Sequence, residues 1–160
     1  HWMVRRQRQM CIRDSRRPVL EDAVVNAKAG CHYPNNARML VEARSKGFDN
    51  ALVADAMGNV AETATANIFM VRDGEVLTPV ANGNFLAGIT RSRHISNLKE
   101  IGQNVKETVL SFQDFETADE VFMSGNMNKV TPVTAFNERQ YQVGPMTRKV
   151  REMYWDWATS

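Results

Sequence analysis

The chain has 160 residues, 43% of them hydrophobic, and a formal net charge of +2, so it is long enough to bury the core of one domain. Its two cysteines, Cys11 and Cys31, lack the spacing of metal ligands, and we expect free thiols in a reducing, cytoplasmic compartment. Neither a run of about 18 apolar residues nor a signal peptide is visible, so we expect no membrane partner.

Residues 1–17 differ from the rest of the chain in charge, because they contain six arginines and one acid, Asp14. Such a basic arm could bind nucleic acid by neutralising phosphates, but aromatic residues do not interleave with the arginines and no basic helix face follows. The string RRQRQMCIRDS instead resembles translated sequencing-adapter DNA. We therefore expect residues 1–17 to be a non-native or disordered leader, with Met10 an artefact of it, and we expect no nucleic-acid partner.

The first native elements are expected to be a strand and a helix. Residues 19–27 combine apolar and small side chains, which predicts a short buried strand that ends close to Lys28. A helix over 33–46 follows, because Pro34 is tolerated in a first turn, apolar residues recur at helical spacing, and Gly47 can end the helix.

Two hairpins come next. Strands over 50–55 and 60–63 flank a turn rich in Gly and Asn, and strands over 66–72 and 75–79 flank Asp73-Gly74, the strongest short hairpin signal in the chain.

The remaining residues predict an alternation of helices and strands. The expected elements are a helix from Thr90 to about Gly102 that Thr90 caps, a strand over 105–110, a short helix from Ser111 to Thr117, strands over 120–123 and 130–136, and a last helix from Gly144-Pro145. This order is neither regular βαβ nor all-β. The expected class is therefore α+β, with a strand-rich sheet and packed helices.

Lys28 is the first candidate for chemistry, since it lies among apolar and small residues in VVNAKAG. A partly desolvated ammonium has a lowered pKa and can supply a nucleophilic amine that forms an imine with a carbonyl. A lysine that merely ends a strand in water would have the same sequence neighbours.

Glu62 is the second candidate, and it precedes a tract of small side chains, Thr63–Ala66, through which a flat ligand could approach the backbone. A buried carboxylate needs a partner. A protonated heterocycle nitrogen or an ordinary surface lysine would serve equally well. Asn67 is expected to fix the loop through hydrogen bonds rather than to act as a catalyst.

Two turns have the character of anion sites. Gly88-Ile89-Thr90-Arg91 at a helix start would offer unpaired N–H groups and a positive dipole end, and Ser124-Gly125-Asn126-Met127 could add further donors. Ordinary turns share these features. The three histidines do not cluster in sequence, and we expect no metal site.

The order of these motifs resembles that of a known family. The motifs are Lys-Ala-Gly from 28, Glu-x-x-x-x-Asn-Ile-Phe from 62, Leu-x-Gly-Ile-Thr-Arg from 86, Glu-Val-Phe-Met-Ser-Gly from 120 and Val-Thr-Pro-Val from 130. Together they resemble the class IV aminotransferases, which use pyridoxal 5'-phosphate, and most of all the branched-chain amino-acid group. The resemblance extends from about Val19 to Trp157.

The resemblance implies roles for the residues that face the cofactor ring. Lys28 matches the lysine that holds the cofactor covalently and moves a proton between the substrate Cα and the cofactor. Glu62 matches the acid that pairs with the pyridine nitrogen and so maintains the ring as an electron sink. Tyr33 matches a tyrosine bonded to the phenolic oxygen, and Leu86 matches a residue that packs on the ring face.

The same resemblance implies where phosphate and substrate bind. Ile89 and Thr90 match backbone donors to the cofactor phosphate, and Asn126 and Met127 match a turn that holds the phosphate and the substrate carboxylate. Thr63 and Thr65 replace the Gly-rich tract of many branched-chain members, and Asn126-Met127 replaces their Thr-Ala, so the amino-acid specificity stays open.

Members of the family are about twice this length. We therefore expect residues 18–160 to be the large cofactor-binding domain, without the small N-terminal domain, and the chain to be a weakly active or inactive fragment. The expected reaction is transamination between an amino acid, preferably branched-chain, and a 2-oxo acid, in a homodimer. The alternatives are a lyase of the aminodeoxychorismate lyase type and a fragment without catalysis.

Overall fold

One mixed sheet dominates the computed structural model, which describes residues 8–160, without the side chains of residues 8, 9 and 11–15. Its strand order is β3-β2-β1-β8-β7-β4-β5-β6, and β9 pairs with β8. The strands are β1 (Arg8–Arg16), β2 (Asn50–Ala54), β3 (Val60–Thr63), β4 (Asn67–Arg72), β5 (Glu75–Pro79), β6 (Val105–Thr108), β7 (Glu120–Gly125), β8 (Lys129–Phe136) and β9 (Arg139–Gln140). The helices are η2 (Gly30–His32), α1 (Tyr33–Ser45), α2 (Ile89–Glu100), α3 (Phe112–Glu116) and α4 (Pro145–Thr159).

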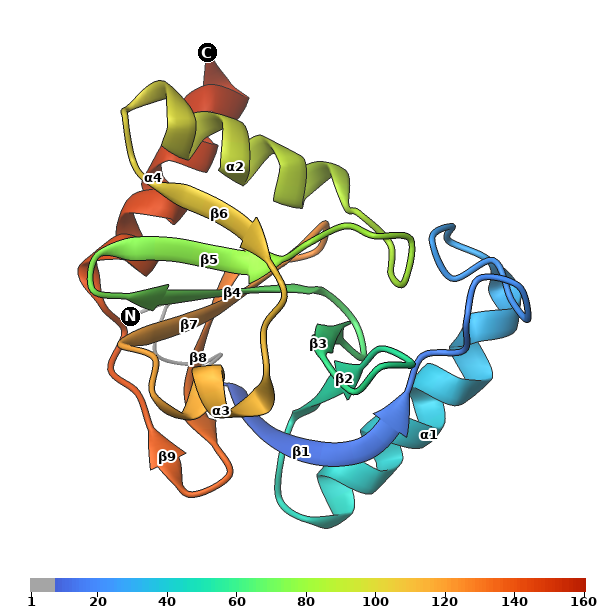
Figure 1. Cartoon of the computed structure of the whole chain (residues 1–160). Coiled ribbons are helices and arrows are strands. Elements are labelled where there is room, and N and C mark those ends of the chain that lie inside the picture. Colours follow the sequence, from blue (N-terminus) through green and yellow to red (C-terminus); the bar gives the residue numbers. More distant parts are fainter. Residues whose placement is uncertain (1–7) are drawn as a thin grey trace.

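Strand β1 connects the two parts of the sheet. It runs parallel to β2 on one side and to β8 on the other, whereas the hairpins β2–β3, β4–β5 and β7–β8 are antiparallel. Figure 1 shows β1 as a long bent strand, with α1 on its side of the molecule and α2 and α4 together at the opposite end.

Alternation of side chains along the strands separates two cores. In β4, Ile68 and Met70 face the core that contains Phe115 of α3, while Phe69 and Val71 face the core under α2 and α4. Successive residues of a strand point to opposite faces, so one apolar strand can pack against helices on both sides. This explains why β4 is buried along nearly its whole length.

Helix α1 covers β2 through a third, smaller cluster. Met39 and Ala43 are its buried residues, and they pack with Ala51 and Val53 of β2 and with Ala64, just after β3. The small side chains on this face let the helix approach closely. As a result, the first turn of α1 lies beside the end of β3.

Local sequence signals predicted most of these elements correctly. The helix over 33–46, the two hairpins and the strand over 130–136 are confirmed within one or two residues. Asp73 and Gly74 both have positive φ, 51° and 75°, as the tight hairpin turn requires. Ser111 caps α3 in a capping box with Asp114, and the α+β class is likewise confirmed.

Residues 19–27 are not the buried strand that their composition predicts. They form successive turns, with hydrogen bonds such as Ala23 N to Val19 O and Ala27 N to Val24 O, and only Val25 among them is buried. The physical reason lies in the sheet, because β1 already occupies the edge of β2 to which such a strand could have added.

Two other expectations need correction. Thr90 does not cap α2, because the helix begins one residue earlier, at Ile89, with Gly88 as its N-cap. Met10, expected to be an artefact, is 1% exposed and packs in the core. Residues 8–16 of the expected leader thus form β1, while their non-native origin stays a prediction.

Candidate active site

A cleft with a volume of about 460 Å³ lies between the loop before α1, the first turns of α1, the end of β3 and the β7–β8 turn. This volume is in the usual range of small-molecule sites. Six of the eight predicted site residues line it: Lys28, Tyr33, Glu62, Leu86, Asn126 and Met127. Segments far apart in the sequence therefore meet at one cavity.

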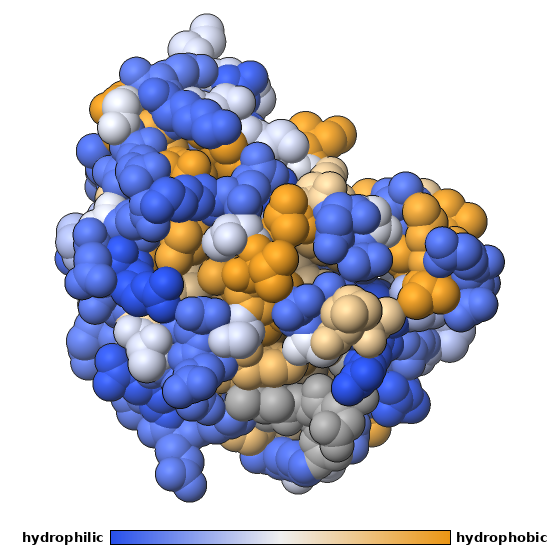
Figure 2. Space-filling model, viewed as in Figure 1, coloured by the Kyte–Doolittle hydropathy of each residue, from blue (hydrophilic) through white to orange (hydrophobic). Residues whose placement is uncertain are grey.

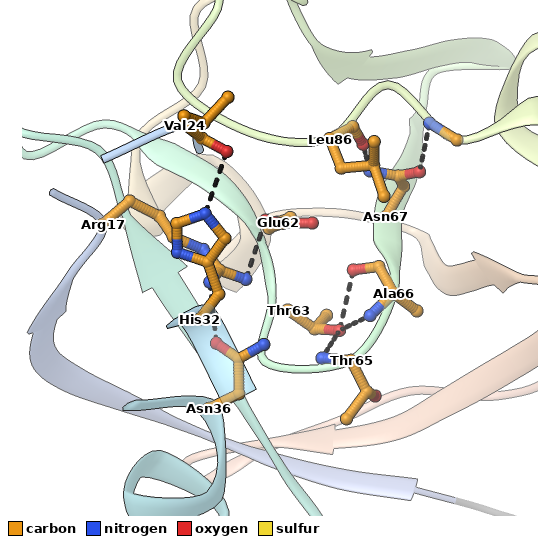
Figure 3. Close-up of polar contacts among 11 residues, drawn as sticks. Arg17, Val24, His32, Asn36, Glu62, Thr63, Thr65, Ala66, Asn67 and Leu86 are labelled. Atoms are coloured by element: carbon orange, nitrogen blue, oxygen red, sulfur yellow. Dashed lines mark hydrogen bonds and ion pairs between the residues drawn. The ribbon is translucent and has the colours of Figure 1, made fainter. Parts of the chain in front are cut away.

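Glu62 lies near the end of β3, with its side chain 9% exposed. Its Oε1 is 2.7 Å from the Nη2 of Arg17, whose side chain is 7% exposed, and Figure 3 shows the two side chains pointing toward each other. The acid is thus paired with a buried arginine. The partner within the protein is therefore Arg17 and not a surface lysine. Pairing of Glu62 with a ligand nitrogen stays a prediction.

Burial raises the pKa of Glu62 to about 7, from a usual value of 4.5, although the charge of Arg17 and its hydrogen bond act in the opposite direction. Desolvation disfavours the carboxylate, and the neighbouring cation favours it. A second cation in the cavity, such as a protonated ring nitrogen, would favour the ionised form further.

Arg17 is held at several points. Its backbone N–H donates to Ala54 O at 2.8 Å, and its Nη1 donates to Asn36 Oδ1 of α1 at 2.7 Å. Sequence reasoning missed both Arg17 and Asn36. A buried carboxylate needs a partner, but the charge of residues 1–17 predicts a leader outside the fold, and Arg17 is part of that segment.

Lys28 lies in the loop before α1 and lines the cavity, but its side chain is exposed. Of the two alternatives for Lys28, a partly desolvated lysine and one in water, the cofactor-free chain shows the second, because residues 19–27 form turns and not an enclosing strand. His32 fixes this loop through a contact of 2.9 Å between its Nε2 and Val24 O. Tyr33 is the first residue of α1 and is 56% exposed.

The small-residue tract after Glu62 is a tight turn held by Thr63. Its Oγ1 accepts hydrogen bonds from the N–H groups of Thr65 and Ala66, at 3.3 and 2.9 Å, and donates to Ala66 O at 2.8 Å. The hydroxyl of Thr65 accepts a bond of 2.8 Å from the buried Asn50. Thr65 itself lines the cavity.

Asn67 acts as the expected loop fixture. Its Nδ2 donates to Leu86 O at 2.8 Å, and its Oδ1 accepts from Gly88 N at 3.1 Å. These bonds hold the segment that carries Leu86 against the start of β4 (Figure 3).

Ile89 and Thr90 do not line the cavity, although the preceding Leu86 does. The Ile89 side chain is 89% exposed, while Thr90 is buried. No side chain caps the start of α2, so the N–H groups of its first turn remain available as donors. Their role toward a phosphate stays a prediction.

Asn126 and Met127 lie in the β7–β8 turn and line both this cleft and an adjoining one of about 220 Å³. Met127 is 87% exposed, and Asn126 Oδ1 accepts a bond from Lys129 Nζ at 3.1 Å. The turn thus separates two hollows of the surface.

His94 and the other candidate ligand groups outside the cleft do not form a metal site in the described part of the chain. His94 is completely buried in the core, and burial lowers its pKa to about 4. Within the described part of the chain, no group of three or more His, Cys, Asp or Glu residues could hold a metal ion. No described helix has the length and apolar character needed to cross a membrane.

The chain is similar to known proteins over most of its length. The family model for amino-transferase class IV matches residues 2–136. A probable branched-chain-amino-acid aminotransferase of Aquifex aeolicus is 37% identical over 128 residues, which are 78% of this chain and 41% of that protein. The chain therefore spans about two fifths of the length of this curated relative.

Solved structures give the same result. An aminotransferase from Brucella abortus bound to the cofactor PLP is 56% identical, with a TM-score of 0.94 over 96% of this chain and 55% of that one. A branched-chain aminotransferase from Thermoproteus uzoniensis with norvaline is 34% identical, with a TM-score of 0.90 over 94% of this chain and 50% of that one.

Proposed function

Because the chain belongs to the class IV aminotransferases, we propose that it is the cofactor-binding part of an enzyme that moves an amino group between an amino acid and a 2-oxo acid with pyridoxal phosphate. The observation that carries the proposal is that Lys28 and Glu62, 34 positions apart in the sequence, line one cavity of about 460 Å³. They supply an amine and a buried carboxylate to the same space.

The residues present fit this cofactor. A flat heterocycle needs an apolar wall and an acid for its nitrogen, and Leu86 and Glu62 offer these on the cavity lining. Burial raises the pKa of Glu62 to about 7, so the carboxyl group is only partly ionised near neutral pH. A second cation beside it would favour the carboxylate. The protonated ring nitrogen of pyridoxal phosphate would be such a cation.

Each residue then has a distinct task. Lys28 would hold the cofactor covalently through Nζ and would move a proton to or from the substrate Cα. Glu62 would hold the proton on the ring nitrogen, and Tyr33 would donate a hydrogen bond to the phenolic oxygen. When bound, the cofactor supplies an electron sink for the negative charge that develops at Cα.

The anion contacts involve two further segments. The N–H groups of Ile89 and Thr90 lie in the first turn of α2, where the helix dipole favours an anion, and we assign the cofactor phosphate to them. Asn126 and Met127 would bind between that phosphate and the substrate carboxylate.

We propose a branched-chain amino acid as the preferred substrate, because the relatives named above include branched-chain aminotransferases. Because Thr65 has a larger side chain than glycine and lines the cavity, the pocket would differ in shape from one lined by glycine. A panel of amino donors with 2-oxoglutarate, followed by product analysis, tests the preference. Release of pyruvate from aminodeoxychorismate would indicate the lyase reaction instead.

We also propose that residues 18–160, together with β1 of the same sheet, form the large domain and that a small N-terminal domain supplies the rest of the pocket. A second copy of the chain would complete a cytoplasmic homodimer. Leu20 and Val24, in the loop beside the cavity, are 43% and 55% exposed, and Figure 2 shows hydrophobic surface over this loop. Sedimentation velocity would test the dimer.

One labelling experiment tests the cofactor assignment. The chain is mixed with pyridoxal phosphate, reduced with borohydride and digested, and the labelled lysine is mapped by mass spectrometry. We expect label at Lys28 and its loss in Lys28→Ala. A Lys46→Ala variant, which removes a lysine just after α1, serves as the matched control and should keep the label. Label elsewhere, or none in the unchanged chain, contradicts the assignment.

A further inference from the structure

Arg17 holds one of the two carboxylate oxygens of Glu62, through the 2.7 Å contact between Nη2 and Oε1. Building on the function proposed above, we propose that Arg17 is a positioning residue that favours the ionised form of Glu62 and directs its carboxylate toward the ring nitrogen of the cofactor. Arg17 acts through Glu62 and not on the reacting atoms.

Burial disfavours the charged form of Glu62. Glu62 is enclosed at the end of β3 with little access to water, and a buried carboxylate without a partner takes up a proton. A protonated Glu62 could not hold a proton on a ring nitrogen. Arg17 opposes this loss of charge both through its own charge and through its hydrogen bond.

No other titratable group that lines the cavity has this role. Lys28, His32 and Tyr33 share the lining with Glu62 and Arg17. The Nε2 of His32 contacts the Val24 carbonyl, and among the residues that the structure describes only Arg17 lowers the pKa of Glu62. Arg17 is thus the cation, within this part of the chain, that favours the carboxylate form of Glu62.

The geometry fixes the direction of the pair. The guanidinium binds Glu62 through Nη2 and Asn36 through Nη1, at 2.7 Å each, and the Arg17 backbone is bonded to Ala54 at the end of β2. A planar fork held at two nitrogens presents a defined orientation, which a lysine ammonium cannot reproduce. Asn36 on α1 therefore helps to orient the guanidinium that binds Glu62.

The test measures Glu62 directly in the cofactor-free chain. Carbon-13 NMR of labelled glutamate, assigned with Glu62→Gln, gives the pKa of Glu62 in the unchanged protein and in Arg17→Met. We expect the substitution to raise this pKa by about 1–3 units, the usual effect of losing an adjacent opposite charge. Arg16→Met removes the exposed neighbouring arginine and should leave the value unchanged. An equal pKa in Arg17→Met overturns the proposal.

Two milder variants keep the test decisive if Arg17→Met does not fold. Arg17→Lys retains the charge and Asn36→Ala retains the guanidinium, but both remove the fixed fork. Each should raise the pKa of Glu62 less than Arg17→Met and should shift the pH dependence of the visible absorbance of bound pyridoxal phosphate. Unchanged values in both variants contradict the proposal.

The outcomes separate this inference from the proposed function. Labelling at Lys28 concerns the cofactor, whereas the titration of Glu62 needs none. If label is missing but the pKa of Glu62 rises in Arg17→Met, the cofactor assignment is refuted and Glu62 has no ring nitrogen to face. The effect of Arg17 on the ionisation of Glu62 is then still supported. Label at Lys28 with an unchanged Glu62 pKa would refute only the role of Arg17.

Discussion

The side chain of Asn67 is bonded directly to the backbone of Gly88, with 3.1 Å between Gly88 N and Asn67 Oδ1. The two residues lie so close that a Cβ atom at position 88 would be 2.6 Å from this oxygen. Glycine at this position thus permits close approach of β4 and the start of α2. The bond is one reason why Leu86 reaches the cavity.

We expect Gly88→Ala to destabilise the chain by about 1–3 kcal/mol, because the new methyl group displaces the Asn67 amide and disturbs its bonds. In an Asn67→Ala background the clash is absent, so the same substitution should cost much less. Urea unfolding of the two single variants and the double variant gives this coupling as a double-mutant cycle. Equal costs in both backgrounds would show that the contact is unimportant.

The local parts of the fold could be read from the sequence because their signals lie within a few residues. Asp73-Gly74 determines a hairpin turn, and Ser111 with Asp114 forms a capping box. The position of β1 could not be read in this way. Its neighbours, β2 and β8, lie about 40 and 120 residues away, and long-range pairing leaves no local pattern.

The electrostatics of the candidate site could not be predicted from the sequence. Lys28, Glu62 and Leu86 line one cavity, while the roles that the family resemblance implies for them stay predictions. The partner of Glu62 depends on how the end of β1 approaches β3. No spacing in the sequence reports that approach, and Arg17 was therefore missed.

Glu120 joins β7 to the start of α4, and we expect Glu120→Ala to be strongly destabilising. Its carboxylate accepts hydrogen bonds from Met146 N at 3.0 Å and from Thr147 N and Oγ1 at 2.8 and 2.7 Å. Losing this buried cap should cost about 2–4 kcal/mol. Glu138→Ala, at an exposed position of the β8–β9 turn, is the control for urea unfolding and should change stability by less than about 0.5 kcal/mol.

Met10 offers a test of whether β1 belongs in the sheet. It is 1% exposed in the core, so Met10→Ala should cost about 2–5 kcal/mol. Met57, which is 83% exposed, provides the matched Met57→Ala control, for which we expect almost no change. If residues 8–16 were a disordered leader in solution, both variants would unfold at the same urea concentration as the unchanged chain.

The pH dependence of stability provides the last prediction. The folded pKa of Glu62 is about 7, above its usual value of 4.5, so the folded state binds the proton more tightly than the unfolded state. The contribution of Glu62 to stability is therefore fully present below pH 4.5 and is lost as the pH rises to about 7. A shift of this size corresponds to about 3 kcal/mol.

Glu62→Gln removes this titration. The stability of the unchanged chain relative to the variant should therefore fall by about 3 kcal/mol between pH 4.5 and pH 7.5, as measured by urea unfolding of both proteins without cofactor. His94 has a lowered pKa and so gives the opposite slope, but it does so in both proteins and cancels in the difference. Parallel stability curves would mean that Glu62 has no raised pKa in the folded chain.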